Sequence, residues 1–177
     1  GAVVVADVGA MRRAMALLND PWPIARLESP REVSQCPPRC VPVWQPECLP
    51  SALDQLAWGA VDARAGKAAA VCIAAAVHSV QAGEGEAIVT APIHKAALAA
   101  AGVPYPGHTE MLQALAGGMP VRMMLANDEL RVVLVTIHQS LKSAIDAVTF
   151  DSVLGTLRAI ASIGPKNNEL TGEIADG

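Results

Sequence analysis

Apolar and polar positions along the chain alternate between strand-like runs and helix-like spacing. Residues 2–6 form a short apolar, β-branched run, and residues 10–18 place apolar side chains at helical intervals, so a strand followed by a helix is expected. Residues 86–92 predict a buried strand that Pro92 ends, and residues 94–101 a helix that closes at Gly102. This succession favours an α/β fold.

Further elements follow from the same patterns. The alanine-rich stretch 53–82 has no internal proline, which favours one long helix or two abutting helices. A polar loop of hairpin length separates two strand-like runs, 121–126 and 130–137, so an antiparallel pair is expected. Additional helices are expected over residues 109–115, 140–148 and 151–163.

Eight of the thirteen prolines lie between Pro21 and Pro50. Because proline removes a backbone donor and disfavours helix before it, this region is predicted to be connecting structure made of short extended pieces. Residues 23–27 and 41–44 are candidates for edge strands within it.

Composition and charge narrow the class of protein. With 177 residues, 52% of them hydrophobic, the chain can bury a core as one domain or two small ones. The formal charge is −4 and no basic stretch interleaves with aromatic residues, which argues against nucleic-acid binding. The longest apolar run, Ala68–Val77, is about half of the roughly 20 residues that a membrane helix needs, so a soluble protein without a membrane partner is expected.

The cysteines indicate the redox state of the cellular compartment. Cys36, Cys40, Cys48 and Cys72 form no CxxC pair, and residues 1–6 are too short and uncharged for a signal peptide. Free thiols in a reduced, cytoplasmic setting are therefore expected rather than a disulfide or a metal site.

Three histidines follow predicted strands or turns, where ligands of α/β sheets gather. His94 and Lys95 begin a helix, where an anion could bind, although spacing alone favours surface residues of a first helical turn. His108 and Thr109 follow Gly107 at another helix start and could donate hydrogen bonds to a phosphate, unless Thr109 merely caps the helix. His138 ends a strand and could bind a divalent metal, or be an ordinary strand-end histidine.

Taken by themselves, the residues predict an α/β domain with an anion-binding, metal-assisted cleft. The fourth histidine, His78, lies within the alanine-rich helix and is predicted to have no role. A catalytic zinc-type site needs three protein ligands, and the chain offers at most two convincing ones. Common nucleotide-binding, serine-hydrolase and metalloprotease motifs do not occur in the sequence.

Residues 87–141 resemble the 4-hydroxythreonine-4-phosphate dehydrogenase family of vitamin B6 biosynthesis. The resembling segments have the family's order and spacing, with weaker agreement from Val3 to about Ile160: 89–95, 101–110, 123–126, 130–132 and 136–138. The family's opening glycine-rich segment, its two later histidine motifs and most of its nicotinamide-binding region have no counterpart here. We therefore expect residues 1–177 to be the N-terminal and central part of a larger two-domain enzyme.

The resemblance implies a fold, a site and a set of ligands. The fold is a three-layer αβα architecture of the isopropylmalate-dehydrogenase-like type, incomplete here, in a homodimer whose metal ligands come from both subunits. His108 and Thr109 correspond to substrate-binding residues and His138 to a metal ligand, while His94 and Lys95 receive no definite step. The cofactors implied are NAD or NADP and a divalent metal such as zinc, magnesium or cobalt.

The activity implied is an NAD(P)-dependent, metal-assisted oxidation of 4-phosphooxy-L-threonine, with decarboxylation, to 3-amino-2-oxopropyl phosphate in pyridoxal phosphate biosynthesis. Ile137, Gln139 and Ser140 depart from the family's pattern around the metal histidine, which leaves the phosphorylated hydroxy-acid substrate open. One alternative is a related dehydrogenase of 4-phosphoerythronate, 4-phosphothreonate or an aromatic cis-dihydrodiol carboxylate. Another is a truncated, non-catalytic domain that binds phosphate.

Overall fold

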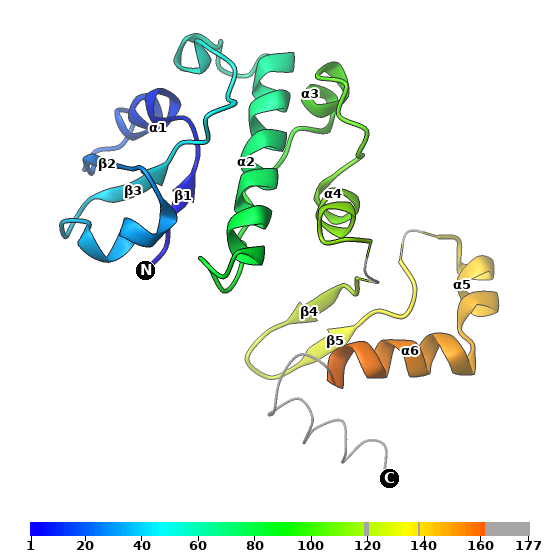
Figure 1. Cartoon of the computed structure of the whole chain (residues 1–177). Helices are drawn as coiled ribbons and strands as arrows, with labels where there is room; N and C mark the ends of the chain where they lie inside the picture. The colour runs from blue at the N-terminus through cyan, green and yellow to red at the C-terminus, as the bar shows by residue number, and fades with distance from the viewer. Residues whose placement is uncertain (119–120, 138, 162–177) are drawn as a thin grey trace. The chain divides into compact units, whose positions relative to one another are not determined.

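The computed structural model describes residues 1–118, 121–137 and 139–161 (Figure 1). The chain divides into two compact units, residues 1–119 and 120–177. The elements of the first unit are β1 (Val4–Val5), α1 (Val8–Met15), β2 (Ile24–Leu27), the 3-10 helix η1 (Pro30–Gln35), β3 (Val41–Trp44), the 3-10 helix η2 (Leu53–Gln55), α2 (Ala63–Gln81), α3 (Lys95–Ala100) and α4 (His108–Leu115). Parallel strands followed by helices confirm the predicted α/β class.

The proline-rich region contributes strands β2 and β3 to the sheet of the first unit. The prediction of connecting structure with edge strands was therefore only partly correct. The strands lie in the order β1-β3-β2 and run parallel, which makes β3 central rather than an edge. Pro42 is tolerated there because the amide of Val41 donates to Pro23 of the β2 side, at 2.9 Å. Successive amides of a strand point to opposite sides, so the position of Pro42 that lacks an N–H group is on the β1 side. The pairing of β3 with β1 starts only at Val43, so no hydrogen bond of that pairing is lost.

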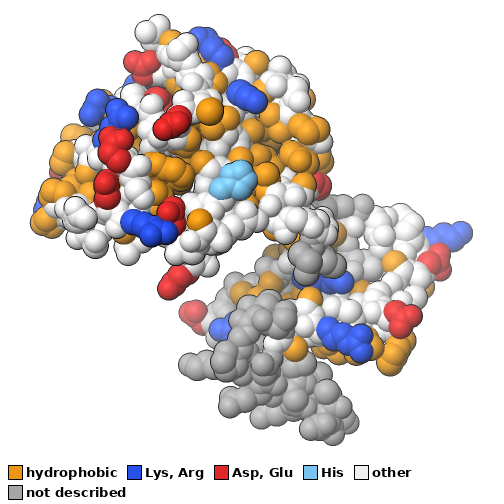
Figure 2. Space-filling view, viewed as in Figure 1, with side chains coloured by type: hydrophobic (Ala, Val, Ile, Leu, Met, Phe, Trp, Pro, Cys, Tyr) orange, Lys and Arg blue, Asp and Glu red, His pale blue; other side chains and the backbone are white. Residues whose placement is uncertain are grey.

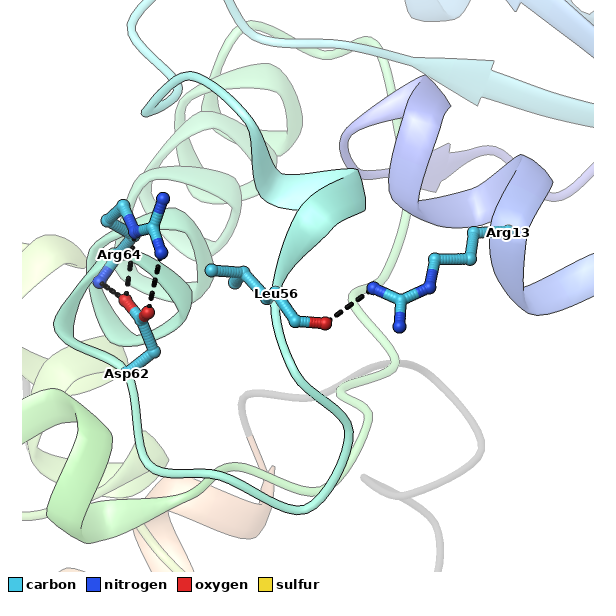
Figure 3. A network of polar contacts seen from close by, with 4 residues as sticks. All are labelled: Arg13, Leu56, Asp62 and Arg64. Atoms are coloured by element: carbon cyan, nitrogen blue, oxygen red, sulfur yellow. Dashed lines mark hydrogen bonds and ion pairs between the residues drawn. The ribbon is translucent and has the colours of Figure 1, made fainter.

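Polar side chains define where α1 begins and what it holds. The carboxylate of Asp7 accepts a hydrogen bond from the amide of Ala10 at 2.7 Å, which caps the helix. Near the other end, the guanidinium of Arg13 donates to the carbonyl oxygen of Leu56 (Figure 3). It also donates to the carbonyl oxygen of Asp54 and lies 4.4 Å from the centroid of the Trp58 ring. These contacts join η2 and the loop after it to α1.

The long helix of the alanine-rich stretch is shorter than predicted. Residues 53–55 form only η2, and α2 starts at Ala63 because the chain is turned at Gly59, whose φ is +74°. Asp62 caps α2 through its carboxylate, which accepts from the amide of Arg64 and pairs with its guanidinium at 2.8 Å (Figure 3). The guanidinium lowers the pKa of the Asp62 carboxyl.

Helix α2 packs closely against α3 through Gly66. A Cβ atom at this position would lie 2.0 Å from the carbonyl oxygen of Ala97, so only glycine allows this approach. The contact brings Ala70 of α2 together with Leu98 of α3 and Met111 of α4 in a buried cluster. This cluster anchors the two short helices that carry His94, Lys95 and His108.

The buried strand predicted over residues 86–92 is wrong for this structure. These residues have no regular secondary structure, and Val89 is 97% exposed. The physical reason is the lack of a partner: a cavity of about 950 Å³ lies between the segment and β1, so no ladder can form. The helix expected after the segment is present as α3.

The second unit contains β4 (Met124–Ala126), β5 (Arg131–Val133), α5 (Leu141–Ala147) and α6 (Phe150–Ala161). β4 and β5 pair antiparallel as predicted, and the side-chain oxygen of Asn127 closes their turn by accepting from the amides of residues 129 and 130. Large apolar side chains are exposed across this unit: Leu125, Leu130, Leu141, Ile145, Val148 and Phe150. In the described residues, no helix is long and apolar enough to cross a membrane.

Candidate functional site

The start of α4 is an uncapped helix N-terminus. Gly107 precedes the helix in extended backbone, with a φ of −173°, and has no side chain with which to bond the first amides. His108 and Thr109 follow within the first turn, and both side chains are half-buried. Because the first amides of a helix lack backbone partners and carry partial positive charge, this turn favours an anion. Since Gly107 occupies the capping position, Thr109 does not cap the helix, contrary to one of the two interpretations of the sequence.

The structure brings the two histidine-containing segments together at Gly107. A Cβ atom on this buried glycine would lie 3.9 Å from Cε of Lys95 and 3.5 Å from Oε2 of Glu110. The ammonium group of Lys95 therefore extends from the start of α3 to the start of α4, and adds positive charge to the helix end. Glu110 offsets part of this charge, so an anion here depends on both the helix amides and Lys95.

His94 has a structural role at the start of α3. Its Nδ1 atom accepts a hydrogen bond from the amide of Ala97 at 3.3 Å, so the imidazole caps the helix. The residue is exposed, as is His78 on α2, for which the sequence predicts no role. Of the His94–Lys95 pair, the structure therefore leaves Lys95 as the residue available to a ligand.

His108 also lines the cavity that separates β1 from residues 86–92. The wall from α2 is mostly apolar, and the segment before α3 lines the cavity up to Ile93, so His108 and the end of this segment share one space. Figure 2 shows apolar side chains over much of the visible face of the first unit. The residues lining the cavity from the sheet and α2 include Val3, Val4, Val5, Ala69, Cys72, Ile73, Ala76 and Val80.

Cys72 is a half-buried thiol in the α2 wall of this cavity. Burial, and secondarily the negative charge of Asp7, raise its pKa to about 11, so it is protonated at neutral pH and is a poor nucleophile. All four cysteines are unpaired in the structure. The thiol contributes to the apolar lining rather than to chemistry.

The predicted metal ligand His138 lies outside the described residues. Among the residues that the structure does describe, no three His, Cys, Asp or Glu side chains are grouped so as to hold a metal ion. These residues alone do not fit a catalytic metal site, which needs three protein ligands. We therefore assign no chemical step to a metal through them.

Sequence reasoning had found the α4 segment but missed two features. It did not predict the contact between Lys95 and Gly107, because residues twelve apart meet only when α3 and α4 pack on the same part of α2. It also did not predict the cavity. The unpaired edge of β1 could have been inferred only from a correct count of the strands in the sheet. The sequence did not give this count, because the proline-rich region was not recognised as a main part of the sheet.

The fold and the site define a class: an α/β unit with an uncapped helix start beside a lysine and a histidine. Comparison with known proteins makes this specific. The family model of the pyridoxal phosphate biosynthetic protein PdxA matches residues 1–169. The chain therefore belongs to the PdxA family.

Curated relatives agree with this assignment. The 4-hydroxythreonine-4-phosphate dehydrogenases of Beijerinckia indica and Trichlorobacter lovleyi are 42% and 36% identical over 88% and 90% of this chain, which correspond to 45% and 47% of their own length. A D-threonate 4-phosphate dehydrogenase of Pectobacterium atrosepticum is 38% identical over 86% of this chain and 46% of its own length. The chain thus spans about half the length of the curated relatives that it matches.

Solved structures show the same similarity. The crystal structure of a 4-hydroxythreonine-4-phosphate dehydrogenase from Klebsiella pneumoniae has a TM-score of 0.77 and 32% identity, with coverage of 88% of this chain and 46% of that one. The corresponding enzyme from Burkholderia phymatum also has a TM-score of 0.77, with 34% identity and coverage of 91% and 49%. Both are similar to this chain over most of its length, which supports the predicted α/β fold.

Proposed function

We propose that this chain forms the N-terminal and central part of an NAD(P)-dependent dehydrogenase that oxidises and decarboxylates 4-phosphooxy-L-threonine to 3-amino-2-oxopropyl phosphate in pyridoxal phosphate biosynthesis. The observation that carries the proposal is the PdxA family match over residues 1–169. The relatives named 4-hydroxythreonine-4-phosphate dehydrogenase supply the reaction. The geometry at the start of α4 supplies a place for an anionic substrate.

His108 and Thr109 are the substrate-binding residues of this proposal. Their amides and side chains lie at an uncapped helix start, with Lys95 next to Gly107, which supports a role in holding an anionic group such as a phosphate or a carboxylate. Holding this group orients the rest of the substrate, which lowers the entropic part of the barrier for hydride transfer. Lys95 neutralises charge on the bound group and is not assigned a proton transfer.

The cofactors belong to the same proposal. NAD or NADP would accept the hydride from the secondary alcohol, and a divalent ion such as zinc, magnesium or cobalt would act as a Lewis acid. His138 is our candidate for one metal ligand. The described residues supply no complete ligand set, so further ligands would come from other parts of the protein or from a partner subunit.

A homodimer in the cytoplasm completes the proposal. The exposed apolar residues of the second unit, such as Leu141 at 79% and Phe150 at 80%, are typical of surfaces that another polypeptide covers. Free thiols in all four cysteines accord with a reducing compartment.

The experiment is a turnover assay on the gene product, from which KM is determined for each variant. NAD(P) reduction is followed at 340 nm with 4-phosphooxy-L-threonine, and His108→Ala is compared with His78→Ala, since His78 is exposed on α2. Loss of a hydrogen bond to a charged group is worth about 1.5–3 kcal/mol, so His108→Ala should raise KM roughly 10- to 100-fold. Equal KM values for the two variants would refute the substrate-binding role.

Two competing functions are separated by the same assay. D-threonate 4-phosphate is the comparison substrate, because a relative that is named for it is 38% identical. A preference for this substrate in kcat/KM would assign the protein to that branch of the family. Phosphate binding without turnover of either substrate, in the presence of both nicotinamides and a divalent metal, would instead favour a non-catalytic domain.

A further inference from the structure

Two of the four cysteines lie at the two ends of one short loop. Cys36 ends η1, where its amide donates to the carbonyl of Val33 at 3.3 Å, and Cys40 directly precedes the strand β3. The residues between them form a turn. Both thiols are free and half-buried. Because η1 and β3 fix the two ends of the loop, the fold determines how far apart the two cysteines lie.

The side chains of the two cysteines approach each other across the turn. The Sγ atom of Cys40 donates to the carbonyl oxygen of Pro37, the neighbour of Cys36, at 2.7 Å, so this thiol folds back over the loop. Desolvation, the charge of Cys40 and a hydrogen bond with the Cys40 side chain raise the pKa of the Cys36 thiol. Two sulfur atoms that share a hydrogen bond are already close, which is the first requirement of a disulfide.

The loop is held in this shape by its prolines and by Arg39. Pro37 and Pro38 each fix a φ angle near about −65°, so the loop has few other conformations. Arg39 has a φ of +61°, in the left-handed region that a residue with a side chain adopts only at a cost. Its guanidinium pairs with Asp20 at 3.4 Å and lies 5.9 Å from the centroid of the Trp22 ring, and both contacts support this conformation. The thiols are therefore kept near each other before any bond forms.

The surroundings of the pair favour a disulfide over a metal ion. A structural zinc ion takes four protein ligands and a catalytic one takes three. In the part of the chain that the structure describes, no third His, Cys, Asp or Glu side chain joins the pair to form such a group. A disulfide needs only the two sulfur atoms. Because a disulfide stabilises a fold more when it closes a longer loop, a bond across this short loop adds little stability and suits reversible exchange.

We propose that Cys36 and Cys40 form a reversible redox pair, which small disulfides oxidise to an intramolecular disulfide and small thiols reduce again. The thiolate of one cysteine attacks a small disulfide RSSR, forms a mixed disulfide and releases RS⁻. The thiolate of the other cysteine then attacks the protein sulfur of the mixed disulfide, which forms the bond between the cysteines and releases the second RS⁻. The protein thiols lose two electrons and two protons, and RSSR gains them as two thiols.

The compartment determines which form of the pair predominates. In a reducing compartment it is the thiol form, which the structure holds. The exchange depends on neither the proposed reaction nor its substrate.

The test is equilibration of the gene product with mixtures of reduced and oxidised glutathione, followed by acid quenching, alkylation, trypsin and mass spectrometry. Trypsin cuts after Arg39, so peptides 32–39 and 40–64, each with one cysteine of the pair, stay joined only through a disulfide. Cys48 also lies on the second peptide, so the Cys48→Ser variant is the starting protein. In this variant, the joined peptides should be the main oxidised product and should separate on addition of dithiothreitol.

Urea separates the effect of the fold from that of mere closeness in sequence. The equilibrium constant for forming the disulfide should be at least about 10-fold larger in the folded protein than in the protein unfolded in urea, which is a reduction potential about 30 mV lower. Adding Cys36→Ser or Cys40→Ser to the Cys48→Ser protein should remove the joined peptides and leave only a mixed disulfide with glutathione. Equal constants in the folded and unfolded protein, or mixed disulfides as the only products of the Cys48→Ser protein, would refute the redox pair.

Discussion

Substitution of Gly66 by alanine tests the packing that holds the candidate site together. A Cβ atom there would lie 2.0 Å from the carbonyl oxygen and 2.3 Å from the carbonyl carbon of Ala97, and 2.8 Å from the amide nitrogen of Leu98. All three atoms belong to the backbone of α3, so no side-chain rotation relieves the overlap. Helix α3 would have to move by about 1 Å to restore even the closest contacts that proteins show.

The expected magnitude follows from two opposing effects. Alanine stabilises a helix interior by about 0.8–1.0 kcal/mol relative to glycine. Overpacking of a well-filled interface costs about 1–3 kcal/mol, and the backbone overlap places Gly66→Ala at the upper end of this range. We therefore expect the free energy of unfolding of the first unit to fall by about 2 kcal/mol.

Urea unfolding followed by tryptophan fluorescence measures this change. Trp22, Trp44 and Trp58 all lie in the first unit, so the signal reports on the part of the chain that contains Gly66. The urea midpoint should decrease without a change in the slope. Displacement of α3 should also move Lys95 away from Gly107 and weaken the binding of inorganic phosphate.

A second helical glycine provides the control. The nearest atom to a Cβ on Gly155 of α6 is Nη2 of the flexible Arg122 side chain, at 3.8 Å. Gly155→Ala should therefore stabilise α6 by about 0.5–1 kcal/mol, measured by hydrogen exchange of its amides. A Gly66→Ala protein that is as stable as the unmodified chain would refute the packing argument, since the backbone overlap predicts a clear loss of stability at this position and none at Gly155.

Three further predictions concern the first unit. Leu98→Ala should lower the unfolding free energy by about 2–5 kcal/mol in the same urea assay, because Leu98 is 1% exposed; a change below about 1 kcal/mol would contradict its core position. Alkylation of Cys72 by iodoacetamide at pH 8 should be at least roughly 10-fold slower than that of the exposed Cys48, and should accelerate as the pH rises toward its pKa of about 11; comparable rates would show that Cys72 is accessible and ionised. Because Arg64 lowers the pKa of Asp62, the stability that this carboxylate adds is present above its ordinary pKa of 3.8 and is lost as the pH falls through the lower folded value. Asp62→Asn should remove this acid-dependent part from urea unfolding curves measured between about pH 6 and pH 2, and an unchanged pH dependence would argue against the cap.

Elements whose signals are local were predicted well. The helix expected over residues 10–18 is present as α1, although it begins two residues earlier, after the capping Asp7. The β4–β5 hairpin turns in the expected polar loop at Asn127, and the helix expected over residues 140–148 is present as α5 after Ser140, whose hydroxyl accepts from the amide of Ser143. In each case the deciding hydrogen bond joins residues only three apart, so a short stretch of sequence contains both partners. The resemblance to the family likewise rested on short segments, and the family match confirmed it.

The candidate site was predicted only in part. The α4 start at His108 and Thr109 was recognisable because a glycine precedes a helical pattern. The position of Lys95 beside Gly107 was not, since it depends on how α3 and α4 pack against α2. The roles of His108, Thr109 and His138 remain predictions, and the His108→Ala assay addresses the first of them.

The amino-acid sequence alone determined the α/β class, the positions of most helices and the family, because periodicity, caps and motif spacing act over a few residues. Tertiary structure alone decided which strands pair. It placed the proline-containing β3 at the centre of the sheet and left residues 86–92 unpaired across a cavity from β1. The physical reason is that a strand, unlike a helix, satisfies its backbone hydrogen bonds with residues distant in sequence, so its formation depends on a neighbouring edge.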